Sequence, residues 1–181
     1  MTISIEEIRR ILTAESSSQK IHVLSKLVKT DNNQIISEIV KMLDDPEIRV
    51  RGEAFSTLVL NPKNISTVLI NHLKSDSKNV RAFSALILAN RNDKTAAENI
   101  SKLTNDDSGM VRSCALGALG HLKAKAFSKN IHDCFSDSNI EVKRSALHAL
   151  ISIGEKISSE DISELKKEND PEINKILNIK N

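Results

Sequence analysis

Aromatic side chains, glycine and proline are all scarce in this sequence. It has four phenylalanines and neither tyrosine nor tryptophan. Proteins that bind single-stranded nucleic acids stack bases on aromatic side chains, and enzymes that extrude a base need a similar pocket, so the composition argues against both classes. Five glycines and three prolines in 181 residues are too few for an all-β fold with many tight turns.

Targeting signals, long apolar runs and excess charge are missing as well. The first residues show no basic region followed by an apolar run, so we expect no secretory signal. No apolar stretch approaches the roughly 18 residues of a membrane helix. The net charge of +2 is too balanced to imply a polyanionic partner. Cys114 and Cys134 fall within helical patterns and are expected to be free thiols in a reducing cytoplasm.

What the sequence does contain is an internal repeat. Four segments align without gaps, beginning at Val50, Val80, Val111 and Val142, and a weaker copy begins at Ile173. The intervals are 30, 31, 31 and 31 residues. Within each copy, apolar or small residues at positions 0, +4, +7 and +8 define one face of a helix. A repeated amphipathic helix with a fixed period predicts a helical repeat protein.

Each copy follows an acidic or serine-rich turn, and each turn follows another helical pattern. Asp and Ser accept hydrogen bonds from the free N–H groups of a first helical turn, so we expect these turns to cap the helices. Pro46 and Pro171 suit the first turn, where a missing donor costs nothing. Each repeat is therefore predicted to be an outer and an inner helix, antiparallel and joined by a short turn.

The predicted architecture is an all-α superhelix, or solenoid, of about six such pairs in a single domain over residues 1–181. The pairs are expected at residues 3–29, 33–61, 64–91, 94–122, 125–154 and 159–179. One pair cannot bury its own apolar stripe, whereas stacked pairs share a continuous core. The apolar end that carries Ile173, Ile176, Leu177 and Ile179 either caps the last pair or contacts something else, and the apolar ends could self-associate.

A pair of about 31 residues with Asp before Val-Arg-x-x-Ala-x-x-Ala-Leu resembles HEAT repeats. It is most similar to the short class found in phycobilisome-lyase-like proteins, over about residues 33–155. This resemblance implies a scaffold or adaptor more often than an enzyme. A HEAT-like di-iron hydroxylase uses repeated His-Glu dipeptides, but the five histidines here are followed by Val, Leu, Leu, Asp and Ala. We therefore expect no metal and no cofactor, and we find no catalytic constellation.

A basic residue recurs at position +1, as Arg51, Arg81, Arg112 and Lys143. One interpretation is a basic stripe for phosphates or an acidic peptide. The other is a structural ladder with the acidic turns, represented by Asp45, Asp76 and Asp107. The accompanying acidic residues favour the ladder, whereas Arg49 and Arg144 lie off this row and are expected to be more open to a partner.

The face of the inner helices opposite the core is the predicted binding surface. Its middle, around Phe83 and Leu86 and then Cys114 and Gly117, is small and apolar, which is typical of a groove for a partner helix. The alternative is that curvature buries these residues between inner helices. The candidate partner-binding residues are Glu53, Phe83, Leu86, Asn90, Cys114, Gly117, His121, Arg144 and His148.

The leading functional hypothesis is a non-catalytic, cytoplasmic adaptor that binds a protein or peptide on this face. A nucleic-acid-binding HEAT-like protein is a second hypothesis, against which the near-neutral charge and the few aromatics argue. An accessory subunit of an enzyme such as a bilin lyase is a third, and it is implied only by the resemblance.

Overall fold

All regular structure in the part of the chain that is described is helical. The structure is a computed structural model, and it describes residues 4–14 and 16–179. These ranges hold twelve α-helices, five short 3₁₀-helices and no strand. The expected all-α fold of about six helix pairs is confirmed. Among the same residues, no helix combines the length and the apolar character needed to cross a membrane.

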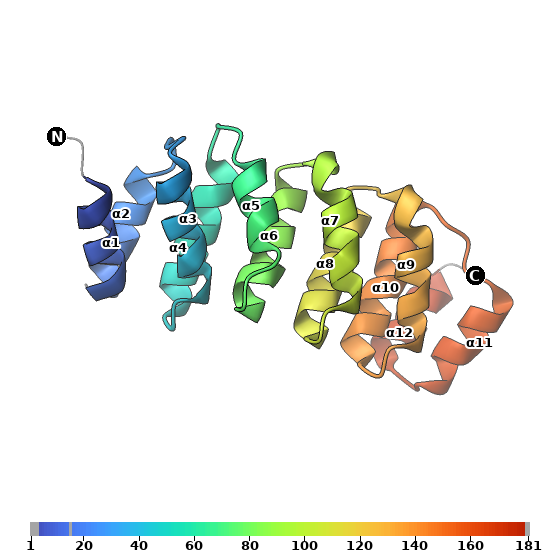
Figure 1. The fold of residues 1–181 in the computed structure, drawn as a ribbon. Helices are drawn as coiled ribbons and strands as arrows, with labels where there is room; N and C mark the ends of the chain where they lie inside the picture. The colour runs from blue at the N-terminus through green and yellow to red at the C-terminus, as the bar shows by residue number, and fades with distance from the viewer. Residues whose placement is uncertain (1–3, 15, 180–181) are drawn as a thin grey trace. The chain divides into compact units, whose positions relative to one another are not determined.

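The chain divides into two compact units, and the first comprises Met1–Arg91. Figure 1 shows its helices in succession. They are α1 (Ile5–Ala14), α2 (Ser17–Lys26), α3 (Asn33–Lys41), α4 (Ile48–Leu60), α5 (Ser66–His72) and α6 (Lys78–Asn90). A 3₁₀-helix, η1 (Met42–Asp44), extends α3. The inner helix α4 packs against both α2 and α6.

The second unit comprises Asn92–Asn181. Its α-helices are α7 (Ala97–Lys102), α8 (Gly109–His121), α9 (Ser128–Asp133), α10 (Ile140–Ile153), α11 (Ser159–Lys167) and α12 (Pro171–Ile179). The 3₁₀-helices η2 (Lys94–Ala96), η3 (Leu103–Asn105), η4 (Lys125–Phe127) and η5 (Cys134–Ser136) flank α7 and α9. The inner helices α8 and α10 pack against each other. In α12, Ile173 and Leu177 are buried, while the Ile179 side chain lies outside the described part.

The predicted core face of the inner helices is confirmed in all four copies. Every residue at positions 0, +4, +7 and +8 of α4, α6, α8 and α10 is buried, with at most 4% of its surface exposed. Small residues at +4, such as Ala54 and Ala115, let neighbouring helices approach closely. Burial extends further than expected in α6, where Ala82 is also fully enclosed.

The turns before the inner helices differ from the expectation in one respect. Asp45, Asp106 and Asp137 do not cap the helix themselves, because each carboxylate accepts from the N–H two residues on. The N-cap residues are Glu47, Ser77, Ser108 and Asn139. Ser77 and Ser108 belong to the predicted turns, whereas Glu47 and Asn139 follow theirs, and Pro46 precedes its helix. Pro171 opens α12 as expected.

Polar contacts join α6 to the end of α4 and to η1, the segment just before α4. At one end, the Asn79 amide donates to Asp44 over 2.7 Å. At the other end, the Arg91 guanidinium donates to four main-chain carbonyls at and beyond the end of α4, those of Leu58, Val59, Asn61 and Lys63, over 2.6–3.3 Å. The last carbonyls of a helix have no partner within it, so Arg91 supplies donors that the helix lacks.

The glycines of α8 give a direct test of this packing. A Cβ on Gly120 would lie 3.0 Å from the Ala149 Cα atom and 3.3 Å from its Cβ, whereas one on Gly117 would meet nothing within 4 Å. We expect Gly120→Ala to lower the free energy of unfolding by about 1–3 kcal/mol through overpacking. Gly117→Ala is the matched control and should raise it by about 0.5–1 kcal/mol, because alanine loses less entropy in a helix. Urea unfolding followed by circular dichroism measures both, and equal effects would contradict the close contact of α8 with α10.

Candidate functional site

The first unit carries an apolar groove on its inner helices. It has a volume of about 360 Å³ and is lined by Ile48, Arg51, Gly52 and Phe55 of α4 and by Phe83 and Leu86 of α6. The four α4 residues are spaced i, i+3, i+4 and i+7, so they share one helix face. The Phe55 and Phe83 rings meet edge to face, with centroids 6.3 Å apart. Ile48 leaves 68% of its surface exposed at the rim.

The groove contains two of the candidate partner-binding residues, Phe83 and Leu86, and both are half-buried. Sequence reasoning missed Ile48 and Phe55, because it took only the positions opposite the core. Ile48 and Phe55 are seven residues apart, which places them on the same helix face as Arg51 and Gly52. This spacing was the signal that could have found them. Glu53 is half-buried and Asn90 is exposed, and neither lines the groove. The Asn90 amide donates to the Leu86 carbonyl over 2.8 Å.

The remaining candidate partner-binding residues lie in the second unit. Gly117, His121 and His148 are exposed, and Cys114 is half-buried. Beside them, the Ser113 and Ser145 hydroxyls are 2.9 Å apart and link α8 to α10. Burial raises the pKa of the Cys114 thiol above its ordinary value. A thiol with a raised pKa is a poor nucleophile at neutral pH.

Arg144 was placed with the partner-binding residues, but its guanidinium is held within the fold. It donates to both Asp170 oxygens over 2.9 and 2.5 Å and to Glu141 over 2.9 Å. A bidentate pair of this kind fixes the side chain. We therefore leave Arg144 out of the candidate site.

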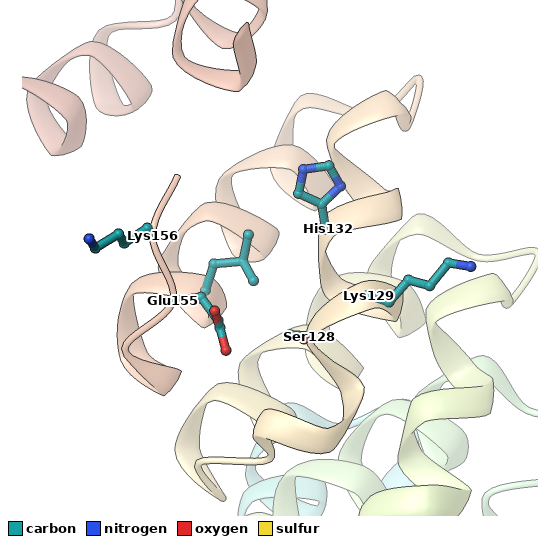
Figure 2. A pocket seen from close by; sticks show the side chains of 6 residues that line it. Ser128, Lys129, His132, Glu155 and Lys156 are labelled. Atoms are coloured by element: carbon teal, nitrogen blue, oxygen red, sulfur yellow. The ribbon is translucent and has the colours of Figure 1, made fainter. Parts of the chain in front are cut away.

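A second hollow, of about 240 Å³, lies between α9 and the segment that follows α10. Figure 2 shows that the Lys129 and Lys156 ammonium groups point away from each other there. His132 is 3.0 Å from the Asp161 carboxylate. Burial raises the pKa of Asp161, but hydrogen bonds from Ser158 and His132 outweigh it, so this pKa lies below its ordinary value. The charged groups do not converge on the hollow, which therefore offers no site.

The three arginines among the basic residues at +1 make a repeated contact with their own turn. The Nη1 group of Arg51 donates to the carbonyls of Asp45 and Pro46. Arg81 does the same to Ser75 and Asp76, and Arg112 to Asp106 and Asp107. Asp76 and Asp107 thus contribute main-chain carbonyls to the predicted ladder, and their carboxylates make no contact with these arginines in the part of the chain that the structure describes.

A second set of contacts joins neighbouring repeats through carboxylates. Lys20 donates to Asp45 over 2.7 Å. Arg112 holds both Asp137 oxygens through Nε and Nη2, over 2.6 and 2.8 Å. Lys143 pairs with Glu168. In each case the acceptor lies 25 residues after the donor, so the carboxylate comes from the turn of the following repeat.

The comparisons with known proteins agree with this architecture. Residues 66–151 match the family model for HEAT repeats. An engineered protein of known crystal structure is 19% identical, with a TM-score of 0.57 over 94% of this chain and 92% of that one. A designed armadillo repeat protein is 18% identical, with a TM-score of 0.54 over 96% of each chain. No curated protein matches the sequence.

A further designed armadillo repeat protein was solved in complex with the peptide (KR)4. It is 17% identical, with a TM-score of 0.55 over 96% of each chain. Identities this low concern the fold alone, which is that of a helical repeat solenoid of the HEAT and armadillo type. The finer assignment to the phycobilisome-lyase-like class stays a prediction.

The contact between Arg112 and Asp137 predicts a pH dependence. The hydrogen bond from Arg112 holds the pKa of Asp137 below its ordinary value. Such a group stabilises the fold above its unfolded-state pKa, near 4, and this contribution is lost as the pH falls through the lower folded-state pKa. We expect Asp137→Asn to lower the free energy of unfolding by about 2 kcal/mol at pH 7, with the difference from wild type shrinking as the pH falls below 4.

Asp107→Asn is the matched control, because that residue contributes its carbonyl and its side chain is exposed. It should change the free energy of unfolding by less than about 0.5 kcal/mol. Urea unfolding at several pH values measures both variants. Equal losses in the two would contradict a carboxylate contact between repeats.

Proposed function

We propose that the chain is a non-catalytic scaffold that binds a peptide or protein segment on the inner-helix face of its first unit. The observation that carries this proposal is the groove between α4 and α6, where Ile48, Phe55, Phe83 and Leu86 form an open apolar surface. Exposed apolar surface flanked by polar residues is typical of protein-binding sites. The similarity in fold to a designed repeat protein solved with a peptide supports the same reading.

The other two hypotheses gain no support from this surface. The groove lining holds one basic side chain, Arg51, whereas binding to duplex DNA needs several phosphate contacts. The residues that line the groove give no specific support to the hypothesis of a bilin lyase subunit. We keep the cytoplasm as the proposed compartment because Cys114 and Cys134 are free thiols.

A peptide selection tests the proposal. Random peptides displayed on phage are selected on the immobilised wild-type chain, resynthesised with a fluorescent label and titrated by fluorescence polarisation. We expect Leu86→Ser to weaken binding roughly tenfold, because truncating an apolar anchor in a groove costs about 1–2 kcal/mol.

Leu60→Ser is the matched control. Leu60 lies on α4, is 67% exposed and does not line the groove, so its loss should leave the affinity unchanged. Circular dichroism checks that both variants are folded. Failure to select any peptide, or equal weakening by the two substitutions, would contradict the proposed site.

A further inference from the structure

Arg51 borders the groove and lacks a contact that its equivalent in the second unit makes. Arg112 uses Nη1 for the carbonyls of its own turn and its Nε–Nη2 edge for the Asp137 carboxylate. Arg51 makes the same Nη1 contacts, over 2.7 and 3.1 Å. Within residues 4–14 and 16–179, no acceptor is present for the Nε–Nη2 edge of Arg51. The guanidinium is thus held in place with one side unused.

The cause is a serine where the neighbouring repeats have aspartate. Ser75 lies five residues before Val80, as Asp45 does before Val50 and Asp137 before Val142. Its hydroxyl accepts from the N–H two residues on, over 3.3 Å, just as the Asp45 carboxylate does over 2.9 Å. The turn is therefore preserved while the carboxylate is missing.

Neighbouring carboxylates do not compensate Arg51. Asp45 accepts from Lys20, and Asp44 accepts from Asn79. Asp76 is exposed, and it forms no ion pair with Arg51 among the residues that the structure describes. An arginine edge without an acceptor, next to apolar side chains, is suited to a planar carboxylate, which it binds with two parallel hydrogen bonds.

We propose that Arg51 binds a carboxylate of the partner, an aspartate or glutamate side chain flanked by apolar residues. The inference rests on the proposed function and narrows its ligand. The acid takes the place that Asp137 takes on Arg112, and the flanking apolar side chains lie against Phe55, Phe83 and Leu86. Charge complementarity and the contiguity of Arg51 with the groove both support this occupant.

The test uses three mixtures of short, end-capped, fluorescein-labelled peptides. Each has a fixed central residue, Asp, Asn or Lys, with Leu, Ile, Val and Phe mixed on both sides of it. On the wild-type chain, we expect the Asp mixture to bind roughly tenfold more tightly than the Asn mixture, the usual effect of a charge-assisted hydrogen bond. The Lys mixture should bind most weakly.

Ser75→Asp supplies the missing carboxylate from within the chain. We expect this variant to lose the preference for the Asp mixture while it binds the Asn mixture as wild type does, and to unfold at a higher urea concentration. Ser75→Asn is the matched control, since its side chain can close the turn without a charge, and it should keep the preference. Arg51→Gln should remove the preference as Ser75→Asp does.

The outcomes separate this inference from the proposed function. Equal binding of all three mixtures to wild type, with Leu86→Ser still weakening them, would leave the groove in place and overturn the role of Arg51. The role of Arg51 would also be overturned if the Ser75→Asp variant still preferred the Asp mixture to the Asn mixture. No binding of any mixture would overturn both proposals. If sedimentation shows a dimer that Ser75→Asp dissociates, a second copy of the chain occupies the groove. This result would overturn the proposal that a peptide of a partner binds there.

Discussion

The structure depends on how the carbonyls of the turns before the inner helices are satisfied. In three of the four turns, two consecutive carbonyls accept hydrogen bonds from one arginine, which follows them by five and six residues. Because the same guanidinium has a second edge, a carboxylate from the next repeat can be added without moving anything. One side chain therefore fixes the local turn and, in the pair of Arg112 with Asp137, the spacing to the next repeat.

These two contacts of one arginine side chain show how repeats of the same pattern can differ in their contacts. Replacing aspartate by serine at residue 75 retains the hydrogen bond that closes the turn and removes only the contact between repeats. The arginine edge left without a carboxylate lies beside α4 and α6. Among the described residues, these are the only neighbouring inner helices whose phenylalanine rings, Phe55 and Phe83, are in contact. A repeat protein can thus change its surface at one position while its backbone stays the same, since each repeat depends mainly on its neighbours.

Sequence reasoning reached the fold because the features that determine it are periodic. The burial of Val50, Ala54 and their equivalents follows from helix geometry, and four copies make that pattern hard to misread. The repeat also predicted contacts between Arg51 and its turn. It did not show that the acceptors are carbonyls, because nothing in the sequence distinguishes a main-chain oxygen from a carboxylate at the same residue.

The candidate site was harder to predict, because it lies where the repeats differ. Phe55 was missed because it sits between the core positions and those opposite them, and its exposure depends on which side chains the next helix presents. Arg144 was predicted to be open because it lies off the row of basic residues at +1, and its contact with Asp170 did not follow from the repeat pattern. The contacts that a side chain makes with the next repeat cannot be predicted from the sequence of its own repeat alone.

The contacts of Arg91 and Asn79 have a consequence for how the groove would bind. Arg91 joins the end of α6 to carbonyls at and beyond the end of α4, and Asn79 joins the start of α6 to Asp44 of η1, just before α4. A groove whose walls are held at both ends is preorganised, so little conformational entropy is lost on the protein side when a ligand enters. The entropic penalty of association then falls mainly on the partner, which favours a segment that already has a defined shape before it binds.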